Sequence, residues 1–172
     1  MGYKEESEGY IMKATTIYQP YASLIACGAK RFETRSRRTH YRGAIAIHAA
    51  KLAPSSWLYI LGRKTVRLME RALFRDEGDF EHYFDDLVRG AVVATADLVE
   101  CWHIGHMNRD GEMCIGAGDP RGVDYKYDYI GGDELHFGDW QEGRYAWELV
   151  NVKPLPEPVS VRGKQGLWNW EL

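Results

Sequence analysis

Short runs of hydrophobic residues, separated by glycine and proline, predict the strands of this chain. In the first run, Thr15, Thr16 and Ile17 are residue types that favour an extended backbone. In all, strands are expected at residues 13–18, 44–49, 90–102 and 145–152, the second of them buried. Proline then recurs at every second position, which predicts an extended segment that does not pair; its prolines are Pro154, Pro156 and Pro158.

Hydrophobic residues at helical spacing predict three helices, at residues 20–27, 54–74 and 79–89. The first begins with a proline, which a first helical turn tolerates, and it stops at Gly28. The longest carries one apolar face, with Gly62 as a weak point inside it. On another face arginine recurs every four residues, which is commonly a solvated face and alternatively a phosphate-binding stripe. These arginines are Arg63, Arg67, Arg71 and Arg75.

Residues 105–143 show little periodicity and are punctuated by glycine, so we expect a long irregular insertion there. Its aromatic residues make it a candidate contact surface for a protein partner. There is no internal repeat and no convincing linker, which predicts one domain over residues 12–172 behind a mobile lead at residues 1–11. Strands scattered among a few helices favour an α+β fold around a partly closed sheet.

A charged cluster directly follows the first predicted helix. Lys30, Glu33 and Arg35 lie on a short extended segment, where Glu33 and Arg35 share one face and Thr34 occupies the other. Such a cluster can bind a phosphate, polarise a carbonyl or position a water molecule. It can equally be a structural ion-pair network at a strand edge.

The residues around this cluster resemble the ASCH domain, a family similar to PUA-like folds. The resemblance lies in Gly28-x-Lys30-x-x-Glu33-x-Arg35, in Gln19 to Leu24 before it and in Arg42-Gly43 after it. Residues 143–149 and 163–168 look like the coactivator-homology branch of that family. The resemblance implies a partly closed β-barrel flanked by helices, with a ligand cleft. Its expected lining residues are Gln19, Tyr21, Lys30, Glu33, Thr34, Arg35, His48 and Lys51.

Nucleic-acid binding is the leading function that the resemblance implies, with RNA or a single strand preferred over regular duplex. The net charge of −3 does not describe a generally basic protein, but arginine concentrates beside the cluster. We expect the cleft to take a base or phosphate and this neighbouring basic segment to hold the nucleic-acid backbone. The basic segment consists of Arg37, Arg38, Tyr41 and Arg42.

The alternative is a hydrolase that acts on a modified nucleobase or nucleoside, or on RNA. Its catalytic residues would be Lys30, Glu33 and Glu148. Family members that hydrolyse N4-acetylcytidine use a lysine, a threonine and a glutamate. Lys30 matches that lysine, whereas Glu33 stands where the threonine is expected.

Composition narrows these classes further. The chain is 45% hydrophobic and 27% charged, as is usual for a globular protein, and it has no apolar run of bilayer length. Three cysteines, an odd number, suit a reducing compartment, so we expect an intracellular protein, cytoplasmic or nuclear. Neither a cofactor nor a metal is expected, because Cys101, His103 and His106 do not have zinc-finger spacing.

Three expectations concern the packing of single residues. Glu148 lies among apolar neighbours, so either Lys30 or Arg35 pairs with it or its strand face is wet. Cys27 is expected to be a packed thiol on the first helix. Trp168 and Trp170 alternate with a polar residue, which predicts that one of the pair packs in the core.

Overall fold

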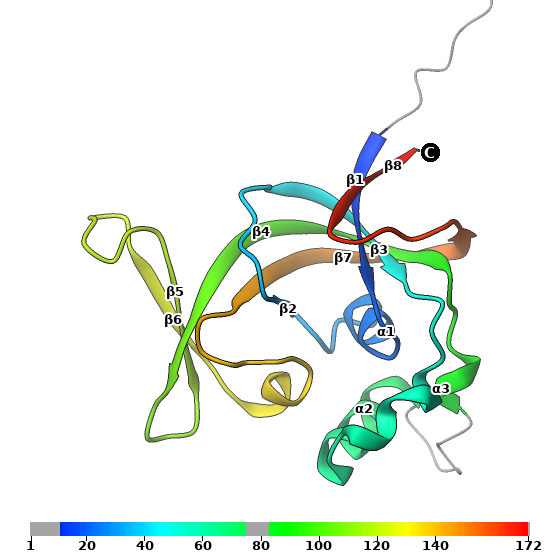
Figure 1. The fold of residues 1–172 in the computed structure, drawn as a ribbon, viewed down its shortest axis with the longest axis horizontal. Coiled ribbons are helices and arrows are strands. Elements are labelled where there is room, and N and C mark those ends of the chain that lie inside the picture. Colours follow the sequence, from blue (N-terminus) through cyan, green and yellow to red (C-terminus); the bar gives the residue numbers. More distant parts are fainter. Residues whose placement is uncertain (1–10, 75–82, 172) are drawn as a thin grey trace, which may run out of the picture.

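The computed structural model describes residues 11–74 and 83–171, in which eight strands form one strongly curled sheet (Figure 1). The strand order is β2-β7-β4-β3-β1-β8, and a hairpin of β5 and β6 extends from β4. The strands are β1 (Ile11–Ile17), β2 (Phe32–Arg35), β3 (Gly43–Ala49), β4 (Ala91–Met107), β5 (Met113–Ala117), β6 (Lys126–Ile130), β7 (Tyr145–Ser160) and β8 (Leu167–Glu171). The predicted α+β class with a half-barrel sheet of PUA-like type is confirmed.

The long strands β4 and β7 give the sheet its curvature. They pair antiparallel from Ala91 opposite Ser160 to His103 opposite Tyr145, with three register shifts on the way. Each shift inserts residues on one strand only, which bends the pair and increases its twist. β1 pairs parallel with β3 and antiparallel with β8, so the first and last described strands lie side by side (Figure 1).

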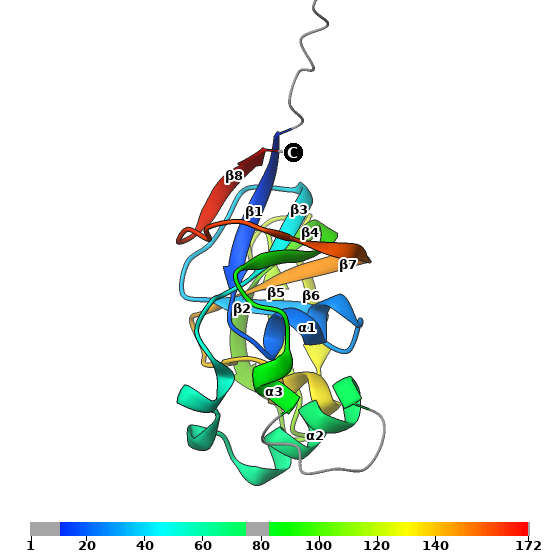
Figure 2. The same ribbon diagram turned by 90° about the vertical axis from the view of Figure 1, so that its right-hand side faces the viewer.

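Helices cover the inner face and one end of the sheet. The helical segments are α1 (Tyr21–Ala26), η1 (Pro54–Ser56), η2 (Leu58–Ile60), α2 (Arg63–Phe74), α3 (Tyr83–Asp86) and η3 (Gly132–His136). α1 packs its buried Ala22 and Ile25 against apolar residues of β3, β4 and β7. Figure 2 shows α2 and α3 together at the end of the molecule opposite β8.

The predicted single helix over residues 54–74 is wrong in its first half. Two short 3-10 turns occupy Pro54–Ser56 and Leu58–Ile60, and the α-helix begins only at Arg63. Gly62 therefore precedes the helix instead of weakening it, in keeping with the low helical propensity of glycine. Of the helix expected at residues 79–89, only Tyr83–Asp86 is helical among the described residues; residues 75–82, with Arg75, lie outside them.

The expected irregular insertion at residues 105–143 is also wrong. β4 continues to Met107, and β5 and β6 form an antiparallel hairpin in register from Met113–Ile130 to Ala117–Lys126. The alternation that reveals a strand is missing, since β5 is mainly buried and β6 is exposed except at Ile130. The hairpin projects beyond the barrel (Figure 1).

Other packing expectations need correction. The proline segment is extended as predicted, but it belongs to β7, and Pro154 lies opposite Ala94 of β4. Trp168 and Trp170 are both buried, because residues two apart on a strand share a face, and they pack in one cluster. Cys27 follows the last turn of α1 and is exposed. Ile11 belongs to β1; the rest of the predicted lead, residues 1–10, lies outside the described residues.

Candidate functional site

Lys30, the centre of the predicted site, lies inside the protein with 1% of its surface exposed. Its Nζ donates to the carbonyl oxygens of Phe32 and Phe137, the latter at 2.5 Å, and lies 3.5 Å from Glu33 Oε2. Burial lowers the pKa of Lys30, and the negative charge of Glu33 opposes that effect. Three acceptors thus surround the ammonium group, an arrangement that fastens β2 to the segment after η3.

Glu33 and Arg35 share a strand face, as predicted. Arg35 Nε lies 3.1 Å from Glu33 Oε1, and its Nη2 donates to Thr15 Oγ1 at 3.0 Å and to the Thr16 carbonyl at 2.9 Å. Thr34 is on the other face, where its Oγ1 accepts a hydrogen bond from the backbone N–H of Asp139 at 2.9 Å. Arg35 therefore ties β2 to β1 at the edge of the barrel opening.

Gln19 and Tyr21 position α1. The fully buried Gln19 donates from Nε2 to the Val88 carbonyl at 2.7 Å and accepts from the Ser23 backbone N–H at 3.0 Å. The Tyr21 ring stacks on Trp57 with 5.5 Å between centroids, and Lys30 Nζ lies 5.5 Å from its centre. Burial, and secondarily the charges of nearby carboxylates, raises the pKa of Tyr21 to about 12.

His48, predicted to line the cleft, instead supports the turn at residues 163–166. Its Nε2 donates to the Val161 carbonyl at 2.9 Å, and its ring meets Trp168 edge-on at 5.8 Å. A Cβ atom on Gly163 would lie 2.7 Å from His48 Nδ1 and 2.8 Å from Thr16 Oγ1, so only glycine fits there. The imidazole thereby sets the path of residues 163–166.

A cleft of about 750 Å³ opens where this turn faces β1 and the residues after β2 and β3. Four basic side chains line it, together with the aromatic rings of Tyr18 and Trp147, and no carboxylate is among its lining residues. The lining consists of Thr16, Tyr18, Arg35, Ser36, Arg37, Ala50, Lys51, Leu52, Trp147, Gly163, Lys164, Gln165 and Gly166. Of the eight ligand-binding residues predicted from sequence, Arg35 and Lys51 are in this lining.

The predicted basic segment divides into two parts. Arg37 and Arg38 are exposed and make no ion pair with any residue the structure describes. Arg42 instead pairs with Glu100 and donates to the carbonyls of Thr39 and Tyr41. The Tyr41 hydroxyl donates to the Ala44 carbonyl at 2.5 Å. Arg42 and Tyr41 are therefore held within the protein, whereas the side chains of Arg37 and Arg38 face solvent.

Glu148 pairs with neither Lys30 nor Arg35, the first of its two predicted alternatives. Its Oε2 accepts a hydrogen bond from Trp102 Nε1 at 2.9 Å, while the ion pairs that Lys30 and Arg35 form within the described chain both go to Glu33. Glu148 of β7 lies opposite Phe32 of β2 and is partly buried. The hydrogen bond from Trp102 replaces the hydrogen bonds to water that its carboxylate loses on burial.

The buried carboxylate that matters most to this region was missed. Glu134 of η3 accepts hydrogen bonds from the backbone N–H groups of Arg31 and Phe32, at 3.0 and 3.1 Å. No sequence period points to a glutamate in a 3-10 turn. The cleft residue Lys164 was also missed as a site residue, although it lies in the segment 163–168 that carried part of the family resemblance.

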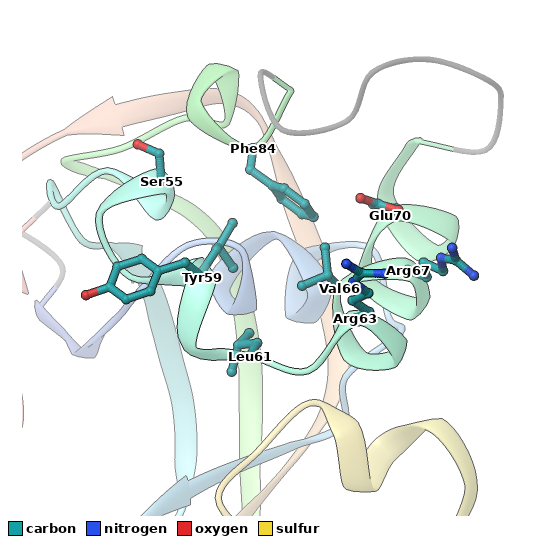
Figure 3. A pocket seen from close by; sticks show the side chains of 9 residues that line it. Ser55, Tyr59, Leu61, Arg63, Val66, Arg67, Glu70 and Phe84 are labelled. Carbon is teal, nitrogen blue, oxygen red and sulfur yellow. The ribbon is translucent and has the colours of Figure 1, made fainter.

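A second hollow of about 510 Å³ lies between η2 and α2, where Arg63 and Arg67 of the arginine stripe contribute to its wall (Figure 3). Its walls are mainly apolar, and Glu70 adds a carboxylate. This hollow lacks the uniformly positive lining of the cleft, so we assign it no role in binding phosphate.

The described part of the chain contains no group of three or more His, Cys, Asp or Glu residues placed to hold a metal ion. Cys101 is buried instead, its Sγ accepting from the Thr39 backbone N–H at 3.5 Å. Among residues 11–74 and 83–171, no helix has the length and apolarity to cross a membrane.

Comparison with known families agrees with this geometry. A family model described as the ASCH domain matches residues 16–158, most of the chain. The matched range includes the charged cluster and extends into β7, and it stops before the turn that carries Lys164. No curated protein sequence matches the chain.

Proposed function

Because the chain belongs to the ASCH family of PUA-like domains, we propose that it binds nucleic acid as an unpaired strand, RNA in preference to DNA. The observation that carries the proposal is the cleft, whose lining contains the exposed cations Arg37, Lys51 and Lys164 and no carboxylate; Arg35, also in the lining, is paired with Glu33. A phosphodiester backbone is the polyanion that such a lining fits best.

The aromatic part of the lining supports an unpaired strand over a duplex. Bases that are free of a partner strand can enter a cleft and stack on rings, and Tyr18, which is 55% exposed, supplies such a ring.

The hydrolase alternative has weaker support. Its central residue Lys30 is buried and directed at two carbonyl groups and Glu33, so a substrate would have to displace these acceptors to reach it. Glu148 is engaged with Trp102 instead of Lys30. The cleft, in contrast, presents Arg37, Lys51 and Lys164 to solvent without rearrangement.

Binding of fluorescein-labelled tetrauridylate, followed by anisotropy over a salt series, tests the proposal. We expect Lys51→Ala with Lys164→Ala to weaken binding and to reduce the slope of log affinity against log salt by about 0.7 for each phosphate that the protein no longer neutralises. A matched control, Arg63→Ala with Arg67→Ala, removes the same charge from α2 and should leave the slope unchanged.

Two results would contradict the proposal. One is an equal loss of affinity in both double variants, which would mean that binding depends on the net charge of the protein and not on the cleft. The other is absence of binding by the unaltered protein to both tetrauridylate and tetradeoxythymidylate at low salt. Tighter binding of the ribo-oligonucleotide is the outcome expected if a 2′-hydroxyl is recognised.

A further inference from the structure

A row of aligned residues leads from the cleft across the sheet to the projecting hairpin. Arg35 of β2 lies opposite Tyr145 of β7, and Tyr145 lies opposite His103 of β4. His103 in turn lies opposite Gly116 of β5, and Gly116 opposite Tyr127 of β6. Since directly opposed residues of neighbouring strands point to the same face of a sheet, these five positions form one continuous row.

The row passes beside a third hollow, which has a volume of about 270 Å³ and is the smallest of the three. Tyr145, His103 and Gly116 belong to its lining, together with Arg38 and Tyr125. The ring of Tyr125 lies over Gly116, where a Cβ atom would come within 2.7 Å of Tyr125 Cζ. His103 and Tyr145 meet edge-on at 5.5 Å. The hollow thus has aromatic walls and an exposed guanidinium group at its edge.

The hairpin end of the row is aromatic and accessible. Tyr127 is 67% exposed and Tyr129, two residues along the same face of β6, is 46% exposed, with 6.2 Å between their ring centroids. These two rings form an accessible aromatic pair on one face of β6.

Two carboxylates near this row are paired with basic side chains, and a third lies on the other face of the sheet. Glu100 is neutralised by Arg42 and Lys126, and Asp119 lies 3.7 Å from Arg121. Asp128 lies opposite Ile115, one residue out of step with Tyr127 and therefore on the other face. Arg38 remains as the cation beside the row.

We propose that this row is a second binding segment for the strand that occupies the cleft. The strand leaves the cleft past Arg35, places one base in the smaller hollow between Tyr145, His103 and Tyr125, and stacks a further base on Tyr127. Arg38 contacts the intervening phosphate. This inference rests on the proposed function and makes its ligand an extended single-stranded RNA of several nucleotides.

The length of the row sets the length of the strand. Arg35 and Tyr127 are four strand spacings apart, which at about 4.8 Å per spacing is about 19 Å. At the roughly 3.4 Å rise of a fully stacked strand this distance takes at most about six nucleotides beyond those in the cleft, and an extended strand takes fewer. A tetranucleotide therefore fills the cleft alone, whereas a dodecanucleotide also covers the row.

Anisotropy with tetrauridylate and dodecauridylate separates the two segments. A site that holds four nucleotides can bind a dodecanucleotide at nine positions along it. These positions alone raise the apparent affinity about ninefold over that of the tetranucleotide. We expect the unaltered protein to exceed that gain by about fivefold or more for each stacked ring. His103→Ala with Tyr127→Ala should reduce the gain to the statistical value without changing tetrauridylate affinity. Gly116→Val, which displaces Tyr125, should act in the same direction.

Tyr59→Ala on η2 is the matched control, since Tyr59 is also an accessible tyrosine and is far from the row in sequence and fold; it should change neither affinity. Thermal unfolding of each variant verifies that the fold is intact. A gain of no more than about ninefold in the unaltered protein overturns the inference and leaves the proposed function in place. A double variant that binds both oligonucleotides like the unaltered protein also overturns it, and favours a protein partner for the hairpin. No binding of either oligonucleotide rejects both proposals.

Discussion

At the level of single residues, Lys30 shows that a residue of the family motif can stabilise the fold. Its ammonium group is enclosed by two carbonyls and Glu33. We predict that Lys30→Met lowers the free energy of unfolding by about 3 kcal/mol, because these acceptors would stay buried without a donor. Urea denaturation measures the change.

Glu33→Gln is the companion variant for Lys30. The amide keeps an acceptor for the lysine, and the site of Glu33 is partly exposed, so the loss should be about 1 kcal/mol.

If Lys30→Met is as stable as the unaltered protein but no longer binds ligand, Lys30 acts on the ligand and the structural interpretation is wrong.

Tyr21 makes stability depend on pH in the alkaline range. Its pKa is raised to about 12 in the folded protein, against 10.0 in an unperturbed tyrosine. Between these values the folded protein keeps a proton that the unfolded chain has lost, so stability must fall as pH rises through the interval. Lys30, with its lowered pKa, contributes the opposite sign in its own interval.

The readout is therefore the difference between the unaltered protein and Tyr21→Phe, taken from melting temperatures at several pH values. We predict that the substitution removes part of the alkaline fall in stability. Tyr59→Phe, at an exposed tyrosine, should give the curve of the unaltered protein. Parallel curves for all three proteins would show that Tyr21 ionises normally.

At the level of elements, η3 is attached to β2 through one carboxylate. Glu134 accepts from two backbone N–H groups at the start of β2. We predict that Glu134→Ala destabilises the protein by about 1–3 kcal/mol, because it leaves these buried donors without an acceptor. Asp133→Ala, at an exposed acid of the same turn, should have almost no effect on urea denaturation. Equal stabilities would mean that η3 is held by Trp140 and Phe137 alone.

Elements were predictable from sequence where local chemistry decides them. α1 follows from a proline at its start and a glycine after it, and β3 from its apolar run. The β5–β6 hairpin was missed because buried and exposed residues do not alternate along its strands: most of β5 is buried and most of β6 is exposed. The helix start at Arg63 was missed because apolar spacing continues through the two 3-10 turns that precede it.

At the level of the whole molecule, the family and fold were predictable, whereas only Arg35 and Lys51 of the predicted ligand-binding residues line the cleft. The spacing of Gly28, Lys30, Glu33 and Arg35 is a local property of one helix end and one strand, so it can be found by pattern. The cleft is made by pairing of distant strands, which brings Thr16 of β1 within 2.8 Å of the Lys164 carbonyl. No periodic pattern in the sequence predicts that residues so far apart along the chain come into contact.

The pairing of β1 with β8 has a consequence for how the protein is made. The ribosome releases β1 first and β8 last among the described strands, so β1 waits with one edge open until most of the chain has been synthesised. Contacts between residues this far apart in sequence also form slowly. Lys164 reaches the cleft only when this late pairing occurs. A nascent chain therefore has no complete cleft until β8 is in place, so the ligand binding that we propose would distinguish finished molecules from partly folded ones.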